Sequence, residues 1–380
     1  MGFPAVVQLF QGPSLGMRVR PLKCLHDKDP GMPGEVHSPP HLVAMAGDAT
    51  VDEDLPRRVA ARLSVQDRVF IHGVRAIGFL VLVIVSAIGL FLGVQAFPTL
   101  SHYGLSFFTE SRWLPSQDII GISAVVLGTI QVALIALLIA VPLSVLTALF
   151  ITDWAPPRLR GTLVSLVDLM AAVPGIVFGL WVLFFIQPHA TLVAHWISKY
   201  FGWFPLFHVR TDVDYPIWNQ APGYPSYAGS AFIAAIAVTM MIFPMATSVM
   251  REVFGEAPAG EKEAALALGA TRWAMVRTVV LPFGRSGIVG GTMLALGRAL
   301  GETISVVLVI SQTFELKPYV LESGTSTISS LIASSFKEAS PAQLSALLTA
   351  GFLLFCMTLV VNSLAAVIVT RSRGGAVTEL

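Results

Sequence analysis

Residues 260–282 read GEKEAALALGATRWAMVRTVVLP and contain two short helical patterns separated by a glycine. The segment Glu261–Leu268 consists mostly of good helix formers such as alanine, leucine and glutamate. Gly269 can adopt the left-handed conformation that ends a helix, and Thr271 can cap the helix that follows. Three apolar side chains would share one face of this second helix: Trp273, Val276 and Val280. The stretch therefore predicts a helix–glycine–helix elbow, in which neither helix is long enough to cross a membrane.

Long apolar segments flank this elbow on both sides. Of the 380 residues, 54% are hydrophobic and only 12% are charged, whereas about 25% is usual for a soluble domain. Such a chain lacks the polar residues to cover a soluble surface, so the composition indicates an integral membrane protein. Six segments exceed the roughly 20 residues that a helix needs to cross hydrocarbon. The predicted transmembrane helices are Val74–Ala96, Ser123–Phe150, Thr162–Ile186, Gly229–Met250, Gly287–Ile310 and Leu344–Val369.

The charged residues are distributed unevenly. The charge-poor windows of the six segments hold only three of the 47 charges, namely Asp168, Arg298 and Glu302. With both termini inside, 18 Lys and Arg residues lie on the inner side and five on the outer side, which satisfies the positive-inside rule. Asp168, near the inner end of its helix, is expected to pair with Arg158 or Arg160 rather than to bind a ligand. The sequence therefore predicts an all-α, multi-pass membrane protein with cytoplasmic termini.

Three parts of the chain are expected on this basis. Residues 1–63 are rich in proline, glycine, histidine and charge, which predicts a disordered cytoplasmic tail. Residues 64–373 form the predicted transmembrane domain, with the cytoplasmic loop 251–282 between the fourth and fifth helices. Residues 374–380 form a short cytoplasmic C-terminal tail.

The fifth predicted helix carries two charges at membrane depth. In the segment GRSGIVGGTMLALGRALGETISVVLVI, residues 284–310, Arg298 and Glu302 are four residues apart and would project from one face. Charges at this depth usually face a bundle interior or a water-filled path. An arginine suits a tetrahedral oxyanion, and a carboxylate favours one that keeps a proton near pH 7, as phosphate does and sulfate does not. The alternative is that Arg298 and Glu302 only neutralise each other.

The same helix contains two pairs of glycines four residues apart, Gly287 with Gly291 and Gly297 with Gly301. Such pairs either permit close helix approach or leave room for a solute.

Two sets of motifs resemble known transport proteins. Glu263, Ala264, Ala265, Gly269, Val279, Leu281 and Pro282 match the EAA-loop pattern of ABC importer permeases, with Val279 in place of the usual isoleucine. The strings ALALGATRW, VVLP and GRALGET, together with AAVPGIVFGLW in the third helix, resemble phosphate-specific permeases, more closely the PstC type than the PstA type. The resemblance covers about Val74 to Arg373. GRALGE is its more specific motif, since the EAA pattern marks ABC importers in general.

The resemblance implies a fold of six transmembrane helices of the ABC importer type I permease kind, with a cytoplasmic coupling helix. It implies an ATPase-coupling role for six residues: Glu263, Ala264, Ala265, Gly269, Leu281 and Pro282. It implies that Arg298 and Glu302 line the substrate path. The implied partners are a second, PstA-like permease subunit, a dimeric PstB-like ATPase and an extracytoplasmic, PstS-like phosphate-binding protein.

The chain lacks the Gly-Lys dipeptide that a nucleotide-binding P-loop requires, and no HExxH or Ser–His–Asp motif is recognisable. We therefore expect a transporter subunit rather than an enzyme, with no catalytic residue, metal site or cofactor of its own. ATP and Mg²⁺ would be bound by the partner ATPase. The net charge of +1 gives no indication of nucleic-acid binding.

The expected function is that of a transmembrane permease subunit of an ATP-driven inorganic phosphate import complex. One alternative is a permease for another oxyanion, sulfate or molybdate. A second is an ion-coupled secondary transporter, a class that often shows inverted repeats, none of which is visible in the sequence. A third is a membrane scaffold that transports nothing, which the intramembrane Arg298 argues against.

Overall fold

The computed structural model describes residues 65–209 and 225–373, and these are helical almost throughout. The predicted tails, residues 1–63 and 374–380, lie outside the described residues. Residues 69–380 form one unit, to which the description below applies. The elements are α1 (Val65–Tyr103), α2 (Ser106–Thr109), β1 (Trp113–Leu114), η1 (Pro115–Gln117), β2 (Ile119–Ile120), α3 (Ser123–Leu149), η2 (Phe150–Trp154), α4 (Pro157–Ala171), α5 (Gly175–Trp181), η3 (Val182–Ile186), α6 (Gln187–Phe201), η4 (Pro205–Phe207), η6 (Pro225–Tyr227), α7 (Ala231–Gly255), α8 (Ala259–Ala267), α9 (Arg272–Met275), η7 (Val276–Val280), α10 (Leu281–Phe283), α11 (Arg285–Gly301), α12 (Ile304–Val309), α13 (Ile328–Ser335) and α14 (Pro341–Arg373).

Within the described ranges, five helical stretches are long and apolar enough to cross a membrane: Val65–Tyr103, Ser123–Trp154, Gly175–Phe201, Ala231–Gly255 and Pro341–Leu364. A sixth crossing requires the pair Arg272–Phe283 and Arg285–Gly301, which is bent by 66°. The all-α membrane class is confirmed. The predicted first, second, fourth and sixth helices are also confirmed, because each coincides with one of the five stretches.

The predicted third helix, Thr162–Ile186, is wrong as a single element. Helix α4 ends at Ala171, and a new helical stretch begins at Gly175 and runs to Phe201. The break falls at Pro174, which has no N–H to donate and keeps the preceding residue out of the helical conformation. Hydropathy does not register this break, because the residues on both sides of the proline are apolar.

The predicted fifth helix, Gly287–Ile310, is also interrupted. Helix α11 ends at Gly301, Glu302 has extended backbone angles (φ −69°, ψ 127°), and α12 begins at Ile304. The consequence is that Glu302 lies outside a helix, so the one-face relation expected for Arg298 and Glu302 does not hold.

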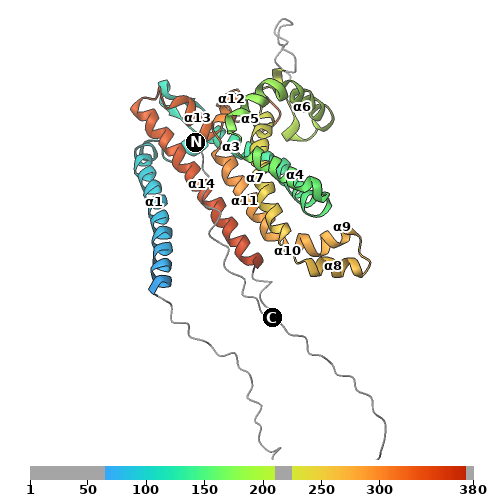
Figure 1. The fold of residues 1–380 in the computed structure, drawn as a ribbon. Helices are drawn as coiled ribbons and strands as arrows, with labels where there is room; N and C mark the ends of the chain where they lie inside the picture. Colours follow the sequence, from blue (N-terminus) through green and yellow to red (C-terminus); the bar gives the residue numbers. More distant parts are fainter. Residues whose placement is uncertain (1–64, 210–224, 374–380) are drawn as a thin grey trace, which may run out of the picture. The chain divides into compact units, whose positions relative to one another are not determined.

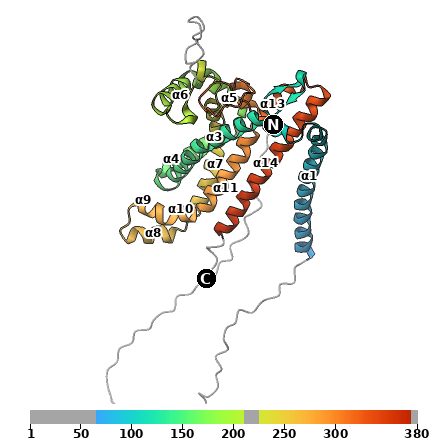
Figure 2. The same ribbon diagram turned by 180° about the vertical axis from the view of Figure 1, so that it is seen from behind.

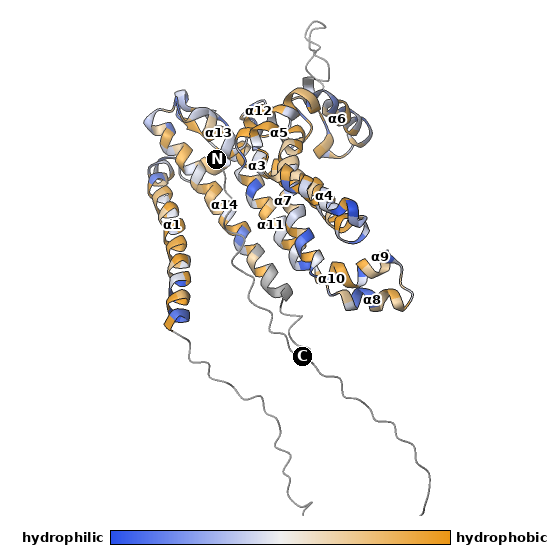
Figure 3. Ribbon diagram, in the orientation of Figure 1, coloured by the Kyte–Doolittle hydropathy of each residue, from blue (hydrophilic) through white to orange (hydrophobic). Residues whose placement is uncertain are grey.

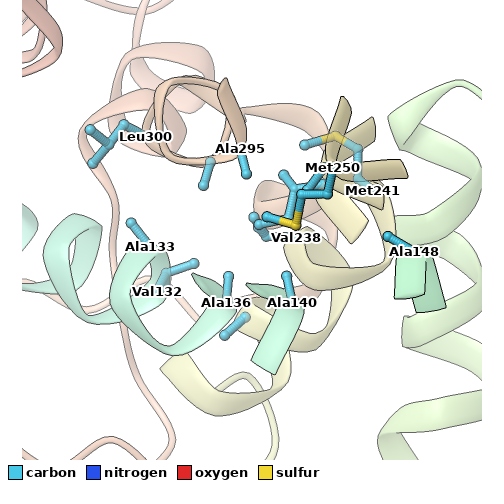
Figure 4. Packing of buried hydrophobic residues seen from close by; sticks show 14 of the residues in the cluster. Val132, Ala133, Ala136, Ala140, Ala148, Val238, Met241, Met250, Ala295 and Leu300 are labelled. Carbon is cyan, nitrogen blue, oxygen red and sulfur yellow. The ribbon is translucent and has the colours of Figure 1, made fainter. Parts of the chain in front are cut away.

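The core lies where α3 packs against α7, with α11 alongside (Figure 1). Figure 4 shows the α3 residues Ala136 and Ala140 beside the larger α7 side chains Val238 and Met241. Ala136 and Ala140 are fully buried, as are alanines on the facing side of α7. Association of helices in lipid depends on close van der Waals packing, and these small residues allow the two backbones to approach.

Helix α1 is packed differently from this core. Helix α14 lies between α1 and α11 in both views (Figures 1 and 2). Helix α1 meets α14 where Gly93 leaves room for Phe352, and Thr99 Oγ1 lies 2.8 Å from Ser345 Oγ. No residue in its most apolar window is buried, and Figure 3 shows apolar residues along its length. This surface is suited to lipid or to another membrane subunit.

The two glycine pairs of α11 have different surroundings. A Cβ atom on Gly287 would lie 2.5 Å from Val253 Cβ, and one on Gly291 would lie 3.2 Å from a carbonyl oxygen of α7. The first pair therefore allows α11 to pack closely on α7. In the second pair, a Cβ on Gly297 would lie 3.4 Å from Asn362 Oδ1 of α14, whereas nothing lies within 4 Å of a Cβ on Gly301. Only Gly301 therefore leaves open space beside it.

Replacing Gly287 with alanine is expected to lower the melting temperature, because the added methyl group would meet Val253 and overpacking typically costs about 1–3 kcal/mol. Gly290→Ala is the matched control, since a Cβ there meets nothing within 4 Å and alanine stabilises a helix by about 1 kcal/mol over glycine. Thermal unfolding of the purified protein in detergent, followed by circular dichroism, measures both. Equal melting temperatures for the two variants would contradict this packing.

Candidate functional site

The elbow forms as the sequence predicts. Gly269 has a φ of +85°, and two hydrogen bonds close the end of α8: Gly269 N–H donates to the Leu266 carbonyl (3.0 Å), and Ala270 N–H donates to the Ala265 carbonyl (3.1 Å). This pattern is a Schellman motif, in which glycine avoids the steric cost of the left-handed conformation. The predicted cap at Thr271 is confirmed, because its Oγ1 accepts from Ala274 N–H at 3.1 Å.

The predicted apolar face of the second helix is partly wrong. Val276 and Val280 are fully buried as expected, but Trp273 is 54% exposed and Met275 is buried instead. Residues 276–280 form a π-helix, whose turns bring residues five apart onto one side. Met275 and Val280 are five apart, whereas the sequence interpretation assumed the ordinary helical period.

The elbow presents an open surface at the end of the bundle opposite α6 and α13 (Figures 1 and 2). Helix α8 has no buried residue, and Leu268 is 90% exposed. Four of the six residues in the predicted coupling set are exposed: Glu263, Ala264, Gly269 and Pro282. The other two, Ala265 and Leu281, pack partly against the core. Such a surface can receive a partner, although its role in coupling stays a prediction.

A second cluster forms where the two interrupted helices meet. Ser305 Oγ lies 2.6 Å from Glu302 Oε1 and 2.9 Å from the Gly175 carbonyl oxygen, and Ser305 N–H donates to Glu302 Oε1 at 3.2 Å. The carboxylate thereby caps the first turn of α12. Ser329 Oγ donates to the Glu302 carbonyl at 2.6 Å. Glu302 is thus held by its backbone and by one carboxylate oxygen, while Oε2 has no hydrogen-bond partner among the described residues.

Arg298 lies in the last turn of α11 and is exposed. Within residues 65–209 and 225–373, its side chain has neither an ion pair nor a hydrogen bond, and it does not pair with Glu302. The alternative that Arg298 and Glu302 only neutralise each other is therefore wrong for this structure. Among the described residues, neither group has an ion-pair partner.

Asp168 has a different partner from the one expected. Its Oδ1 lies 3.7 Å from Arg251 Nη2 and accepts a hydrogen bond from Ser248 Oγ at 3.2 Å. The prediction of Arg158 or Arg160 is wrong, because α4 packs along α7, which carries Ser248 and Arg251. Asp168 joins two helices and stands apart from the Glu302 cluster.

Sequence reasoning missed the residues that fix Glu302 in place. Gly175 directly follows the only proline in AAVPGIVFGLW, and a Cβ there would lie 3.0 Å from Glu302 Oε1. Ser305 is the first hydroxyl-bearing residue within α12. The proline is a usable signal for a break, but no sequence pattern indicates that the two breaks face each other.

Comparison with known proteins bears on what this arrangement does. The family described as "Binding-protein-dependent transport system inner membrane component" matches residues 140–374. The chain belongs to this family. Its members are membrane components of ABC importers rather than enzymes, so the chain is a multi-pass inner-membrane permease subunit of a system that also contains an ATPase and a binding protein.

Relatives within this family are named for one substrate. The phosphate transport system permease protein PstC 2 of Mycobacterium tuberculosis is 38% identical over 303 residues, which cover 79% of this chain and 90% of that protein. The protein named PstC from Xylella fastidiosa is 39% identical over 299 residues, covering 78% and 88%. Most of each relative is therefore represented in this permease subunit.

The fold also matches a solved permease. A chain in the crystal structure of a bacterial alginate ABC transporter, in complex with an alginate pentasaccharide-bound periplasmic protein, aligns with a TM-score of 0.52 at 16% identity. The alignment covers 79% of this chain and 93% of that chain. This likeness supports the ABC importer permease fold and nothing about the substrate.

Replacing Gly269 with alanine is expected to loosen the elbow locally. No atom lies within 4 Å of a Cβ at this position, so the cost is the left-handed backbone alone, about 1–2 kcal/mol. Amides of residues 265–275 should exchange with deuterium about 5–30-fold faster, as measured by mass spectrometry. Gly260→Ala is the control, since its Cβ also meets nothing and its φ is ordinary; equal exchange in both variants would count against the strained cap.

Proposed function

We propose that this chain is the PstC-like permease subunit of an ATP-driven inorganic phosphate importer, and that Arg298 and Glu302 line the phosphate path. The observation that carries this proposal is the state of the two charged groups. Arg298 has no partner among the described residues, and Glu302 is anchored with one oxygen open, within a family whose relatives are named phosphate permeases. Unpaired charges at membrane depth are costly unless they face a solute path.

The two groups have complementary chemistry for phosphate. The Arg298 guanidinium offers a fork of N–H donors that matches two oxygens of a tetrahedral anion. The free Oε2 of Glu302 accepts a hydrogen bond from a protonated oxyanion and repels one without a proton. Gly301, between the two residues in sequence, has open space beside it, with nothing within 4 Å of a Cβ there. This arrangement favours phosphate over sulfate near neutral pH.

The proposed assembly has four kinds of component. A PstA-like permease subunit pairs with this chain, and the exposed Arg298 faces the path between them. A dimeric PstB-like ATPase binds ATP and Mg²⁺, and a PstS-like phosphate-binding protein docks outside. The positive-inside bias supports a cytoplasmic location for both termini and the elbow.

The elbow is the proposed docking element for the ATPase. The exposed Glu263, Ala264, Gly269 and Pro282 allow close approach by a partner, while Ala265 and Leu281 connect that surface to the bundle. Movement of the ATPase dimer on ATP binding would displace α8 and thereby open the path.

The second candidate is a permease for sulfate or molybdate. Its support is that the EAA pattern marks ABC importers in general and that Arg298 alone would bind any tetrahedral oxyanion. Competition between these anions and phosphate in an uptake assay separates the two functions.

Replacing Arg298 with glutamine in the complete importer should reduce phosphate uptake at least about tenfold, because two charge-assisted hydrogen bonds are lost. Uptake of radiolabelled phosphate into cells that lack their own importer measures this. Arg285→Gln, at the start of the same helix, is the matched control and should transport normally while inserting to the same level. Normal uptake by the Arg298 variant would rule out the assigned role.

Replacing Glu302 with glutamine keeps an acceptor for Ser305 but removes the negative charge. Sulfate should then inhibit phosphate uptake about tenfold more strongly than in the wild type, since the repulsion of a fully ionised oxyanion is lost. The measurement is the sulfate concentration that halves uptake. Glu338→Gln, which alters an exposed carboxylate elsewhere, should leave that concentration unchanged. An unaltered value for the Glu302 variant would show that its charge does not select the anion.

A further inference from the structure

The elbow is tied to the transmembrane bundle by an ion pair that the sequence patterns did not single out. Lys262 Nζ lies 3.1 Å from Asp153 Oδ1, and the two side chains are only 19% and 8% exposed. Lys262 directly precedes the Glu263 of the EAA pattern, and Asp153 directly follows a charge-free window of 34 residues, Ile119–Thr152. The two residues are 109 positions apart in the chain.

Asp153 belongs to η2, the π-helical end of the stretch that begins with α3. Its second carboxylate oxygen accepts from Thr152 Oγ1 at 2.8 Å. The carboxylate is therefore oriented on both sides, with one oxygen held by its own helix and the other directed at the lysine. A carboxylate fixed in this way gives the ion pair a defined direction.

Lys262 reaches a third element as well. Its Nζ lies 3.5 Å from the carbonyl oxygen of Phe254, near the end of α7. One ammonium group thus connects α8 with the ends of the two helices whose contact forms the core. Because α3 and α7 are packed along their alanines, a displacement of their ends is carried into the bundle.

Helix α8 has few other attachments. None of its residues is buried, and Ala265 packs only partly against the core. The flanking chain at Pro258 and Gly269 makes turns rather than continuing a helix, so α8 is not a rigid extension of either neighbouring helix. The Lys262–Asp153 pair is the most buried polar contact that α8 makes within the described residues.

We propose that the Asp153–Lys262 ion pair is the mechanical link that transmits movement of α8 to α3. Both are positioning residues, since neither touches the substrate. The inference rests on the proposed function only in that an ATPase moves α8; it does not depend on the substrate being phosphate. Removing one partner leaves a buried, uncompensated charge, whereas replacing both with apolar residues keeps the packing and removes the directional bond.

The test uses the complete importer reconstituted in proteoliposomes, with uptake and ATP hydrolysis measured together. The informative variant is the apolar pair Asp153→Leu/Lys262→Met, and the reversed pair Asp153→Lys/Lys262→Asp restores an ion pair in the same place. The control is Glu322→Leu/Lys317→Met, in the loop between α12 and α13. It removes an ion pair of similar length (3.2 Å) and burial, together with the longer contact of Lys317 with the exposed Glu315 (3.7 Å).

The apolar pair should still assemble and hydrolyse ATP, but the phosphate transported per ATP should fall about tenfold, equivalent to about 1.4 kcal/mol of lost coupling. The reversed pair should recover most of this ratio, and the control pair should keep it. A wild-type ratio in the apolar pair would overturn the inference, as would a reversed pair that assembles without recovering.

A wild-type complex that takes up no phosphate would contradict the proposed function instead. In that case, the dependence of ATP hydrolysis on the binding protein is the measure of coupling. Loss of that dependence in the apolar pair supports the link, and its retention overturns it.

Discussion

Backbone polar groups at membrane depth must find their partners inside the protein, because hydrocarbon offers none. This constraint is met where the two interrupted helices of this permease adjoin. The Glu302 carboxylate accepts from Ser305 N–H at the start of α12, and Ser329 Oγ donates to the Glu302 carbonyl. The Ser305 hydroxyl also reaches the Gly175 carbonyl at the start of α5. One carboxylate oxygen of Glu302 thus serves as the hydrogen-bond acceptor at the start of α12. The other, Oε2, has no partner among the described residues, and it is the atom that the proposed phosphate path uses.

Structure that depends on interactions between neighbouring residues could be predicted from the sequence, whereas structure that depends on distant contacts could not. The elbow depends on capping rules that operate within a few residues, so Gly269 and Thr271 were placed correctly. Trp273 was misplaced because a π-turn changes the helical period and has no recognised sequence pattern here. The interruptions at Pro174 and Glu302 were missed because hydropathy averages over windows that are apolar on both sides of each break.

Because few physical reasons place a charged group at membrane depth, the sequence alone marks Arg298 and Glu302 as candidate site residues. Their neighbours could not be identified in this way. Ser305 lies 130 positions from Gly175, and Lys262 lies 109 positions from Asp153, so these contacts exist only once the bundle is folded. The functional roles of the site residues stay predictions. The assignments of the family and of the fold do not depend on those roles.

The seam of alanines between α3 and α7 also determines how this protein can vary. At Ala136 and Ala140 the side chains are fully buried against another helix, so a larger residue would force the backbones apart. On α1, by contrast, exposed leucine, valine, isoleucine and phenylalanine side chains can be exchanged for one another at little cost in lipid. Residue size is therefore constrained along the seam, whereas the exposed face of α1 constrains only apolar character.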